Sequence, residues 1–507
     1  MSDARVVIVG AGVGGLVSAL LLAHRGVEVV VIEAADAPGG KLHTRQVQGA
    51  VIDAGPTVMT MRWVFDEIMR SVGTSLEREL RLTPLSVLAR HFWPDGSRMD
   101  LCADPLQSEA EVERLAGPLE AGRFRRFCDR ARALHDALEK PFMRGGTPQM
   151  ARFMAQLGPS GLALLSQLGP MRSLWQQLQR EFTDPRLRQL FGRYATYCGS
   201  SPWEAPATLM LIAQVEMDGV WSIDGGMQTL AEVLTCLAQA RGARFIFNAR
   251  CEEILVRDGK ACGVRLASGE QYAADSVIYN GETAALRSGD LGESSRHAVR
   301  ALALPRSLSA VTWAMHAPRQ SLALDRHNVF FQNDYASEFE DIFDRGRLPR
   351  SPTVYVCAQD RPVASGHGEG ERLLCLVNAP PTGDQPENIQ EIEQCEQISF
   401  DFLQQMGLNL RGVPSMRTTP AQFHQRFGHS GGALYGSVTH GWMSIFARPG
   451  AKTGMEGLYL AGGGVHPGPG VPMAALSGRK AAEAVLANLG SISTYRREAT
   501  SGGMSMP

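Results

Sequence analysis

The sequence lacks both an excess of one charge and any close pair of cysteines. Its 507 residues include 50 lysines and arginines against 52 aspartates and glutamates, for a formal net charge of −2. This balance argues against nucleic acid as a partner. The nine cysteines are scattered without a C-x-x-C pair, so neither a zinc site nor a dithiol redox pair is indicated. We therefore expect a protein of a reducing, cytoplasmic compartment that holds no metal.

The sequence also lacks a convincing membrane span or signal peptide. Residues 6–23 carry no charge, which is close to the length of a spanning helix. Glycines interrupt this run, however, and no basic segment precedes it, since Arg5 is offset by Asp3. The run is better interpreted as a buried strand followed by a buried helix.

A glycine-rich turn separates that strand from that helix. Residues 5–9 read as a strand, and residues 10–15 have the sequence Gly-Ala-Gly-Val-Gly-Gly. This G-x-G-x-x-G, placed between a strand and a helix, is typical of a dinucleotide-binding fold. Gly10 permits the tight turn, Gly12 lets the backbone approach a pyrophosphate, and Gly15 lets the helix pack closely on the strand. The amides at the helix start would then face the phosphates.

The next strand leads to an acidic residue and a second pair of glycines. Strand Glu28–Ile32 ends at Glu33, 18 positions after the last motif glycine, where an acid accepts hydrogen bonds from the adenosine ribose. Gly39-Gly40-Lys41 follows and is expected to bring backbone amides near the diphosphate or flavin. Lys41 or Arg45 adds positive charge there.

This Gly-Gly-Lys extension resembles the large FAD family that includes amine oxidases and carotenoid desaturases. In that family E-x-x-x-x-x-G-G-[KR] follows the second strand, as it does here from Glu33 to Lys41. The resemblance implies an α/β fold with a Rossmann-type FAD-binding domain. It also implies that the backbone at Cys251 lies against the adenine. Because no second G-x-G-x-x-G occurs, we expect one FAD and no pyridine nucleotide site.

The C-terminal segment carries the most specific part of the resemblance. A strand over 457–461 is followed by the turn 462–472, Gly-Gly-Gly-Val-His-Pro-Gly-Pro-Gly-Val-Pro, and by a helix predicted from about Met473 to Leu489. Pro472 suits a first helical position, and the helix start would direct its positive dipole end toward the flavin. His466 is either catalytic or a capping or packing residue. The positions predicted to contact FAD are Gly10, Gly12, Gly14, Gly15, Glu33, Gly39, Gly40, Lys41, Arg45, Gly55, Pro56, Thr57, Cys251, Gly462, Gly463, Gly464, Val471, Pro472 and Met473.

Over nearly its whole length the chain is similar to carotenoid (phytoene-type) desaturases. Asp-Ala-Gly-Pro-Thr at 53–57 and the 466–472 stretch are signatures of that group. Residues 58–67 and 194–210 look like the bacterial hydroxyneurosporene desaturases. This resemblance implies an enzyme that introduces a 3,4 double bond into acyclic 1-hydroxycarotenoids, by hydride transfer to flavin N5 and proton loss. The alternatives are another carotene desaturase, an amine oxidase, or an FAD carrier without activity.

The FAD-binding domain is expected to be discontinuous, with an inserted α+β substrate domain. We assign residues 1–72, 219–289 and 440–489 to the first, residues 73–218 and 290–439 to the second, and residues 490–507 to a mobile tail. Residues 150–178 are apolar and poor in charge. They predict either a buried helix pair that lines a tunnel or a surface that dips into a membrane.

The catalytic base cannot be assigned from these patterns. The polar candidates are Glu204, Asp218, His466 and, as a positioning cation, Arg193, while Trp63 and Trp221 either flank the flavin or pack in the core. For a water-insoluble carotenoid substrate we expect peripheral contact with the inner membrane. The sequence leaves two electron acceptors open, oxygen and a membrane quinone.

Overall fold

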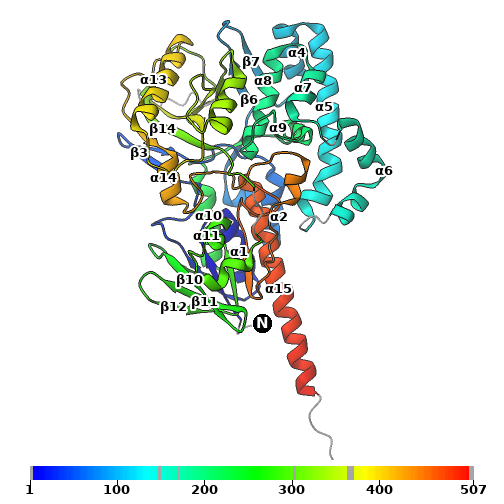
Figure 1. The fold of residues 1–507 in the computed structure, drawn as a ribbon, viewed down its shortest axis with the longest axis vertical. Coiled ribbons are helices and arrows are strands. Elements are labelled where there is room, and N and C mark those ends of the chain that lie inside the picture. Colours follow the sequence, from blue (N-terminus) through cyan, green and yellow to red (C-terminus); the bar gives the residue numbers. More distant parts are fainter. Residues whose placement is uncertain (1–3, 147–149, 170, 301–303, 362–369, 502–507) are drawn as a thin grey trace, which may run out of the picture.

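Two large β-sheets organise the chain, one of five strands and one of seven. The computed structural model describes residues 4–501 except 147–149, 170, 301–303 and 362–369. Figure 1 shows the five-stranded sheet in the lower half of the molecule and the seven-stranded sheet in the upper half, beside a layer of helices. The functional cavity described below lies between these parts.

All neighbouring strands of the five-stranded sheet are parallel. Such sheets are covered on both faces, so their strands are rich in Val and Ile. Val6 and Ile8 face one hydrophobic core and Val7 faces another. In sheet order the strands are β19 (Leu458–Leu460), β13 (Ser276–Tyr279), β1 (Arg5–Val9), β2 (Glu28–Ile32) and β9 (Arg244–Ile246).

Helices cover one face of the parallel sheet and a small antiparallel sheet covers the other. The helices are α1 (Val13–His24), α10 (Gln228–Gln239) and α15 (Val471–Ser501). The small sheet consists of β10 (Cys251–Arg257), β11 (Lys260–Leu266) and β12 (Gln271–Ala273). The predicted strands β1 and β2 are confirmed residue for residue.

Residues 272–278 read as one continuous strand in the sequence, and this interpretation is wrong, because the chain forms two strands there that belong to different sheets. β12 ends at Ala273, and β13 starts at Ser276 in the parallel sheet. Asp275 makes the transition: its amide donates to the Arg5 carbonyl, and its carboxylate accepts from the Arg5 amide at 2.9 Å. These bonds turn the chain from one sheet into the next.

The seven-stranded sheet takes its strands from the two inserted segments. Only the pair β15–β6 is parallel, and the other neighbours are antiparallel. In sheet order the strands are β18 (Ser415–Thr418), β14 (Ser309–Pro318), β17 (Gly370–Ala379), β16 (Val354–Ala358), β15 (His327–Phe330), β6 (Val87–Phe92) and β7 (Arg98–Cys102). Helix α13 (Ile389–Gln405) packs on one face through Ile392 and Leu403.

A layer of helices stands beside this sheet and encloses the cavity. Its core is made of aromatic and aliphatic side chains such as Phe124, Phe127 and Phe191. The helical elements are α4 (Pro105–Ala116), α5 (Pro118–Leu138), η1 (Glu139–Arg144), α6 (Met150–Leu168), α7 (Leu174–Glu181), α8 (Pro185–Gly192), η2 (Arg193–Cys198), η3 (Ala207–Met210) and α9 (Leu211–Met217).

The remaining elements are short connections. They are β3 (Thr44–Val47), β4 (Ala50–Asp53), α2 (Arg62–Ser71), α3 (Leu76–Glu79), β5 (Leu82–Pro84), β8 (Trp221–Ile223), α11 (Thr283–Ser288), η4 (Glu293–Ala298), α12 (Tyr335–Phe339), η5 (Glu340–Asp344), α14 (Pro420–Arg426) and η6 (Trp442–Phe446). The five parallel strands all lie within 1–72, 219–289 and 440–489, the segments that the sequence assigns to one domain. The domain bounds themselves stay a prediction.

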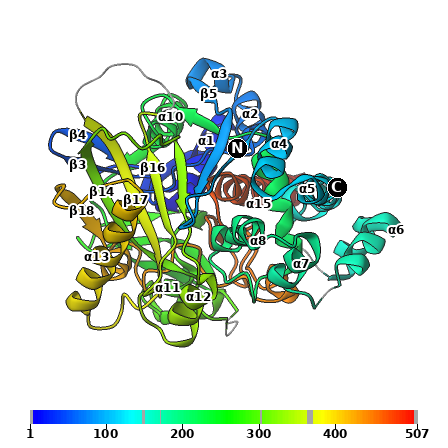
Figure 2. The same cartoon turned by 90° about the horizontal axis from the view of Figure 1, so that it is seen from above.

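The apolar stretch 150–178 forms α6 and the start of α7. Helix α6 is kinked at Gly158, next to Pro159, and it stands at the edge of the molecule (Figure 2). Phe153 and Leu157 are buried, whereas Met154 and Leu162 are exposed. Within the described ranges, no helix is both long enough and apolar enough to cross a bilayer.

The last helix is longer than predicted. Helix α15 was expected to end near Leu489, but it continues through Ser501, where Figure 1 shows it extending beyond the body of the protein. Residues 491–501 contain no proline or glycine, so no helix-breaking residue interrupts the backbone hydrogen bonds in this stretch. Residues 502–507 of the predicted tail lie outside the described residues.

The crossing of α1 and α15 depends on a glycine. A Cβ atom at Gly478 would overlap the backbone of Gly14, and Ser18 Oγ donates to the Gly478 carbonyl at 2.8 Å. We expect Gly478→Ala to lower the free energy of unfolding by about 1–3 kcal/mol, because two backbones must separate. Chemical denaturation measures the change.

Gly490→Ala is the matched control, since it lies in the same helix with open space around its Cβ position. It should leave stability unchanged or raise it by up to about 1 kcal/mol. Equal effects of the two substitutions would contradict a role for the crossing.

Candidate functional site

One cavity of about 1650 Å³ joins the glycine motifs to the seven-stranded sheet and the helical layer. Drug-sized ligands occupy pockets of roughly 300–1,000 Å³, so this space is large enough for a dinucleotide and a second ligand. Every residue predicted to contact FAD lines the cavity except Gly15 and Arg45. The sequence therefore located one half of the cavity.

The first glycine turn, residues 10–15, forms the wall at one end of the cavity. Gly10 has a φ of +101°, a conformation that side chains rarely adopt. The Leu16 amide donates to the Gly12 carbonyl at 2.9 Å and so starts the hydrogen bonds of α1. The amides before it lie at the N-terminus of α1, where an anion is stabilised. Gly15 is the packing residue expected, because a Cβ there would overlap the Gly10 carbonyl.

The second glycine pair, Gly39 and Gly40, lies against the first glycine turn. A Cβ at Gly40 would lie 3.1 Å from the Gly12 Cα, so a side chain there would crowd the first glycine segment. Glu33 lies next to them, and its carboxylate accepts from the amides of Ala11 at 2.6 Å and Ala35 at 2.8 Å. A carboxylate has further lone pairs, so Glu33 can still accept a ribose hydroxyl.

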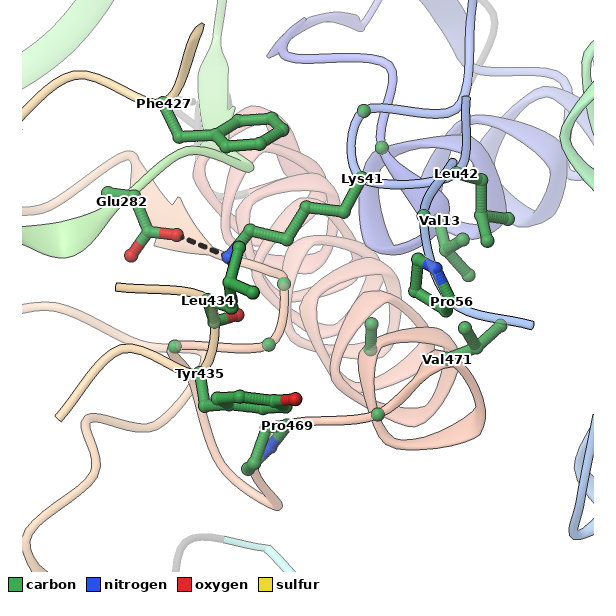
Figure 3. A pocket seen from close by; sticks show the side chains of 18 of the residues that line it. Val13, Lys41, Leu42, Pro56, Glu282, Phe427, Leu434, Tyr435, Pro469 and Val471 are labelled. Atoms are coloured by element: carbon green, nitrogen blue, oxygen red, sulfur yellow. Dashed lines mark hydrogen bonds and ion pairs between the residues drawn. The ribbon is translucent and has the colours of Figure 1, made fainter. Parts of the chain in front are cut away.

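Lys41 crosses the middle of the cavity wall. Its Nζ donates to Glu282 and to the Leu434 carbonyl, both at 2.8 Å, and lies 5.4 Å from the centroid of the Phe427 ring. Figure 3 shows the side chain reaching from the second glycine pair to these partners. Lys41 thus ties the first segment to the 427–435 segment. Arg45 does not line the cavity.

The C-terminal glycines and the start of α15 form the opposite wall. Helix α15 begins at Val471, two positions before the predicted Met473, and Pro472 lies in its first turn. His466 is buried but does not line the cavity. Its ring meets the edge of Phe142 at 5.0 Å, and burial, with Lys480 nearby, lowers its pKa to about 3. The packing interpretation of His466 therefore fits this structure.

These features fit FAD. Two glycine segments approach to a distance that a Cβ would fill, an open helix N-terminus faces the gap, and an acidic residue stands at the end of the second strand. No group of three or more His, Cys, Asp or Glu within the described residues is arranged to hold a metal ion.

The other half of the cavity is mainly apolar with a few buried polar groups. Apolar side chains come from α9 and from the sheet, and include Leu211, Ile212, Val215, Val329, Leu374 and Leu376. The polar groups form three clusters: Arg193, Tyr197 and Glu216; Thr57 and Tyr355, which His327 contacts from outside the cavity wall; and Glu338, Thr353 and Asn378. The sequence singled out Arg193 but missed Glu216 and Glu338, because only the fold turns these acids inward.

The other candidate bases are misplaced for catalysis. Glu204 and Asp218 are exposed and do not line the cavity. Asp218 ends α9, where it accepts a hydrogen bond from Gln214 at 2.6 Å. Trp63 and Trp221 also lie outside the cavity wall, and both pack on the core of the parallel-sheet side. Glu204 and Asp218 are therefore rejected as bases, and the tryptophans are packing residues.

We expect Lys41→Met to weaken FAD binding roughly tenfold, since it removes charge-assisted hydrogen bonds and leaves Glu282 without a cation. Glu282 is only 13% exposed. The readouts are the flavin content of purified protein and titration of the apoprotein with FAD. Lys260→Met removes a more exposed ion pair with Glu456 and should bind FAD normally. Full flavin retention by Lys41→Met would refute this role.

Comparison with known proteins places the whole chain in one family. A model of the family described as "Flavin containing amine oxidoreductase" matches residues 13–486. The chain is 54% identical to a hydroxyneurosporene desaturase of Rubrivivax gelatinosus over 99% of this chain and 97% of that protein. It is 44% identical to a hydroxyneurosporene desaturase of Cereibacter sphaeroides, over 96% and 98% of the two chains.

The fold agrees with this relationship. An oxidoreductase from Methanosarcina mazei superimposes with a TM-score of 0.63 at 16% identity, covering 94% of this chain and all of that one. With the FAD-compatible cavity, these findings identify the chain as a member of the flavin-containing amine oxidoreductase family and, within it, of the FAD-dependent carotenoid desaturases.

Proposed function

We propose that the enzyme introduces the 3,4 double bond into acyclic 1-hydroxycarotenoids during carotenoid biosynthesis. The observation that carries this proposal is the continuity of the cavity, in which an apolar chamber with buried polar groups opens onto the predicted flavin site. A long hydrocarbon fits the apolar walls, and a hydroxyl group requires polar partners inside them. The similarity to hydroxyneurosporene desaturases supports the same substrate class.

The protein's contribution to the reaction is orientation and exclusion of water. FAD, when bound, supplies the acceptor for a hydride from the substrate carbon. The walls formed by α9 and the seven-stranded sheet hold the polyene in one orientation and keep solvent away from it. A positive charge that develops beside a polyene is delocalised over it, so loss of the proton from the neighbouring carbon requires only a modest base. The chain therefore needs few strongly basic groups in this chamber.

An anaerobic experiment tests the substrate. We expect the flavin band of the FAD-loaded protein to bleach, and the polyene spectrum to shift to the red, on mixing with liposomes that contain a 1-hydroxylated acyclic carotenoid. Phytoene liposomes should cause neither change. Turnover of phytoene without turnover of the hydroxylated compound would assign the protein to the other carotene desaturases. Admitting either oxygen or a quinone afterwards distinguishes the two electron acceptors by the rate at which the flavin band returns.

We also propose that the protein binds peripherally to the inner membrane through α6 and its neighbours. Met154, Leu162, Met171 and Met443 are exposed apolar side chains from α6, the connection after it, and η6. Phe153 of α6 packs edge-on against Phe446 of η6 at 5.2 Å, so these elements form one surface, here called the α6–η6 surface. A carotenoid is insoluble in water, and such a surface would let it pass from the bilayer to the cavity.

Liposome flotation tests this surface. We expect Leu162→Glu combined with Met171→Glu to lower the bound fraction at least severalfold, because charges resist entry into the apolar layer. Leu119→Glu is the matched control, since Leu119 is 84% exposed at the start of α5, away from α6 in Figure 1. Equal loss of binding in both variants would contradict the assignment.

A further inference from the structure

A buried charged cluster lies in the wall of the apolar chamber. Glu216 of α9 accepts from Tyr197 of η2 at 2.9 Å and pairs with Arg193 of η2 at 3.4 Å. Arg193 also donates to the Tyr197 hydroxyl. All three residues line the cavity, and the charged side chains of Arg193 and Glu216 are only 8% and 6% exposed.

A contribution to stability does not by itself explain this cluster. A buried ion pair often contributes less than well-packed apolar side chains would, because both charges lose their hydration. In addition, Arg193 Nε is buried without a hydrogen-bond partner among the described residues. A buried donor without a partner is rare in folded proteins, and a bound ligand or a water molecule that accepts from the guanidinium would account for it.

The cluster lies near the predicted flavin site, where the reacting end of the substrate must be bound. A Cβ at Gly199, the residue after η2, would lie 2.7 Å from the Tyr435 ring, so η2 packs on Tyr435. The Tyr435 carbonyl accepts from Arg448, which also donates to the Gly463 carbonyl of the C-terminal glycine segment. Figure 3 shows Tyr435 beside Pro469 in that segment. Tyr435 and Arg448 therefore connect the cluster to the C-terminal glycine segment that is predicted to contact the flavin.

The other two polar clusters also hold a buried polar atom without a partner in the described part of the chain, His327 Nε2 and Thr353 Oγ1, but neither atom carries a charge, since burial lowers the pKa of His327 to about 3. The Tyr355 hydroxyl is already engaged by Thr57 and by His327, both at 2.7 Å. Glu338 accepts from the Thr353 amide at 3.0 Å and from Asn378 at 2.8 Å. Of these three clusters, only the one around Arg193 combines a cation that still has an N–H group unpaired among the described residues with a carboxylate acceptor beside it.

We infer that Arg193, Tyr197 and Glu216 bind the tertiary hydroxyl of the carotenoid and so determine substrate specificity. The inference rests on the proposed function. The Arg193 guanidinium donates to the hydroxyl oxygen, and the hydroxyl proton is accepted by Glu216 or the Tyr197 oxygen. In a 1-hydroxycarotenoid this group stands close to the C3–C4 bond, so binding it beside the flavin wall positions the reacting carbons.

The same contacts would reject carotenoids without the hydroxyl. Such a substrate would displace water from the chamber and offer no acceptor to the Arg193 guanidinium, whose Nε has no partner in the part of the protein that the structure describes, and an unsatisfied buried polar group discriminates strongly. Specificity then comes from a penalty on the wrong substrate as well as from attraction of the right one.

The test compares kcat/KM for a 1-hydroxylated acyclic carotenoid and for its non-hydroxylated counterpart, with FAD-loaded enzyme and carotenoid-bearing liposomes. We expect Tyr197→Phe to reduce the preference of the wild type by roughly tenfold or more, and Arg193→Met by roughly 10- to 100-fold. Activity toward the non-hydroxylated compound should not fall in parallel. Flavin content should stay normal in both variants.

Tyr194→Phe is the matched control. Its hydroxyl donates to the same Glu216 carboxylate at 2.6 Å, but Tyr194 faces the protein core and not the cavity. It should retain the preference. If Arg193→Met does not fold, the double variant Arg193→Met with Glu216→Gln removes both charges together and takes its place.

The outcomes separate the two proposals. If the wild type prefers the hydroxylated carotenoid and Tyr197→Phe keeps that preference, the hydroxyl is bound elsewhere and only the present inference is overturned. An equal loss in Tyr194→Phe would also overturn it, since the effect would be structural. A wild type that does not act on the hydroxylated carotenoid would overturn both proposals.

Discussion

The close approach of backbone at the two ends of the chain is the constraint on which the functional architecture depends. Helix α1 meets α15 at Gly14 and Gly478, where no side chain fits between them, and Ser18 joins the two backbones by hydrogen bonds. This contact places the N-terminus of α1 opposite the start of α15. Both helix starts then face one cavity, so a dinucleotide can be bound by segments more than 450 residues apart, as Gly12 and Val471 show.

A second constraint arises where the cofactor half of the cavity meets the apolar half. Lys41 bridges the second glycine pair to Glu282 and to the carbonyl of Leu434, and thereby joins the first segment of the chain to the inserted one. Beyond this bridge the walls are mainly apolar. Because these walls surround it, and a bound hydrocarbon would displace water there, each buried polar group carries more weight than it would at the surface. This explains how a small cluster such as Arg193, Tyr197 and Glu216 could distinguish two nearly identical hydrocarbons.

The local features were predictable because they depend on neighbours in the sequence. The strands β1 and β2 follow from short Val and Ile runs, and the glycine turn follows from residues that tolerate unusual φ angles or close backbone contact. The predictions of secondary structure failed where contacts between distant residues determine where an element ends. Asp275 divides an apparently continuous strand by bonding to Arg5, and the last helix passes Gly490, which by itself is too weak an interruption to end it.

The sequence by itself therefore determined the Rossmann-type motif, the acidic residue after the second strand, and the family to which the chain belongs. These depend on spacing along the chain, which a linear pattern preserves. Only the tertiary structure decided which polar residues enter the chamber. Glu216 lines the cavity while Asp218, two positions later, is exposed, because successive positions of a helix point in different directions. A side chain's direction is fixed by the packing of its helix, and this information is absent from the residue type.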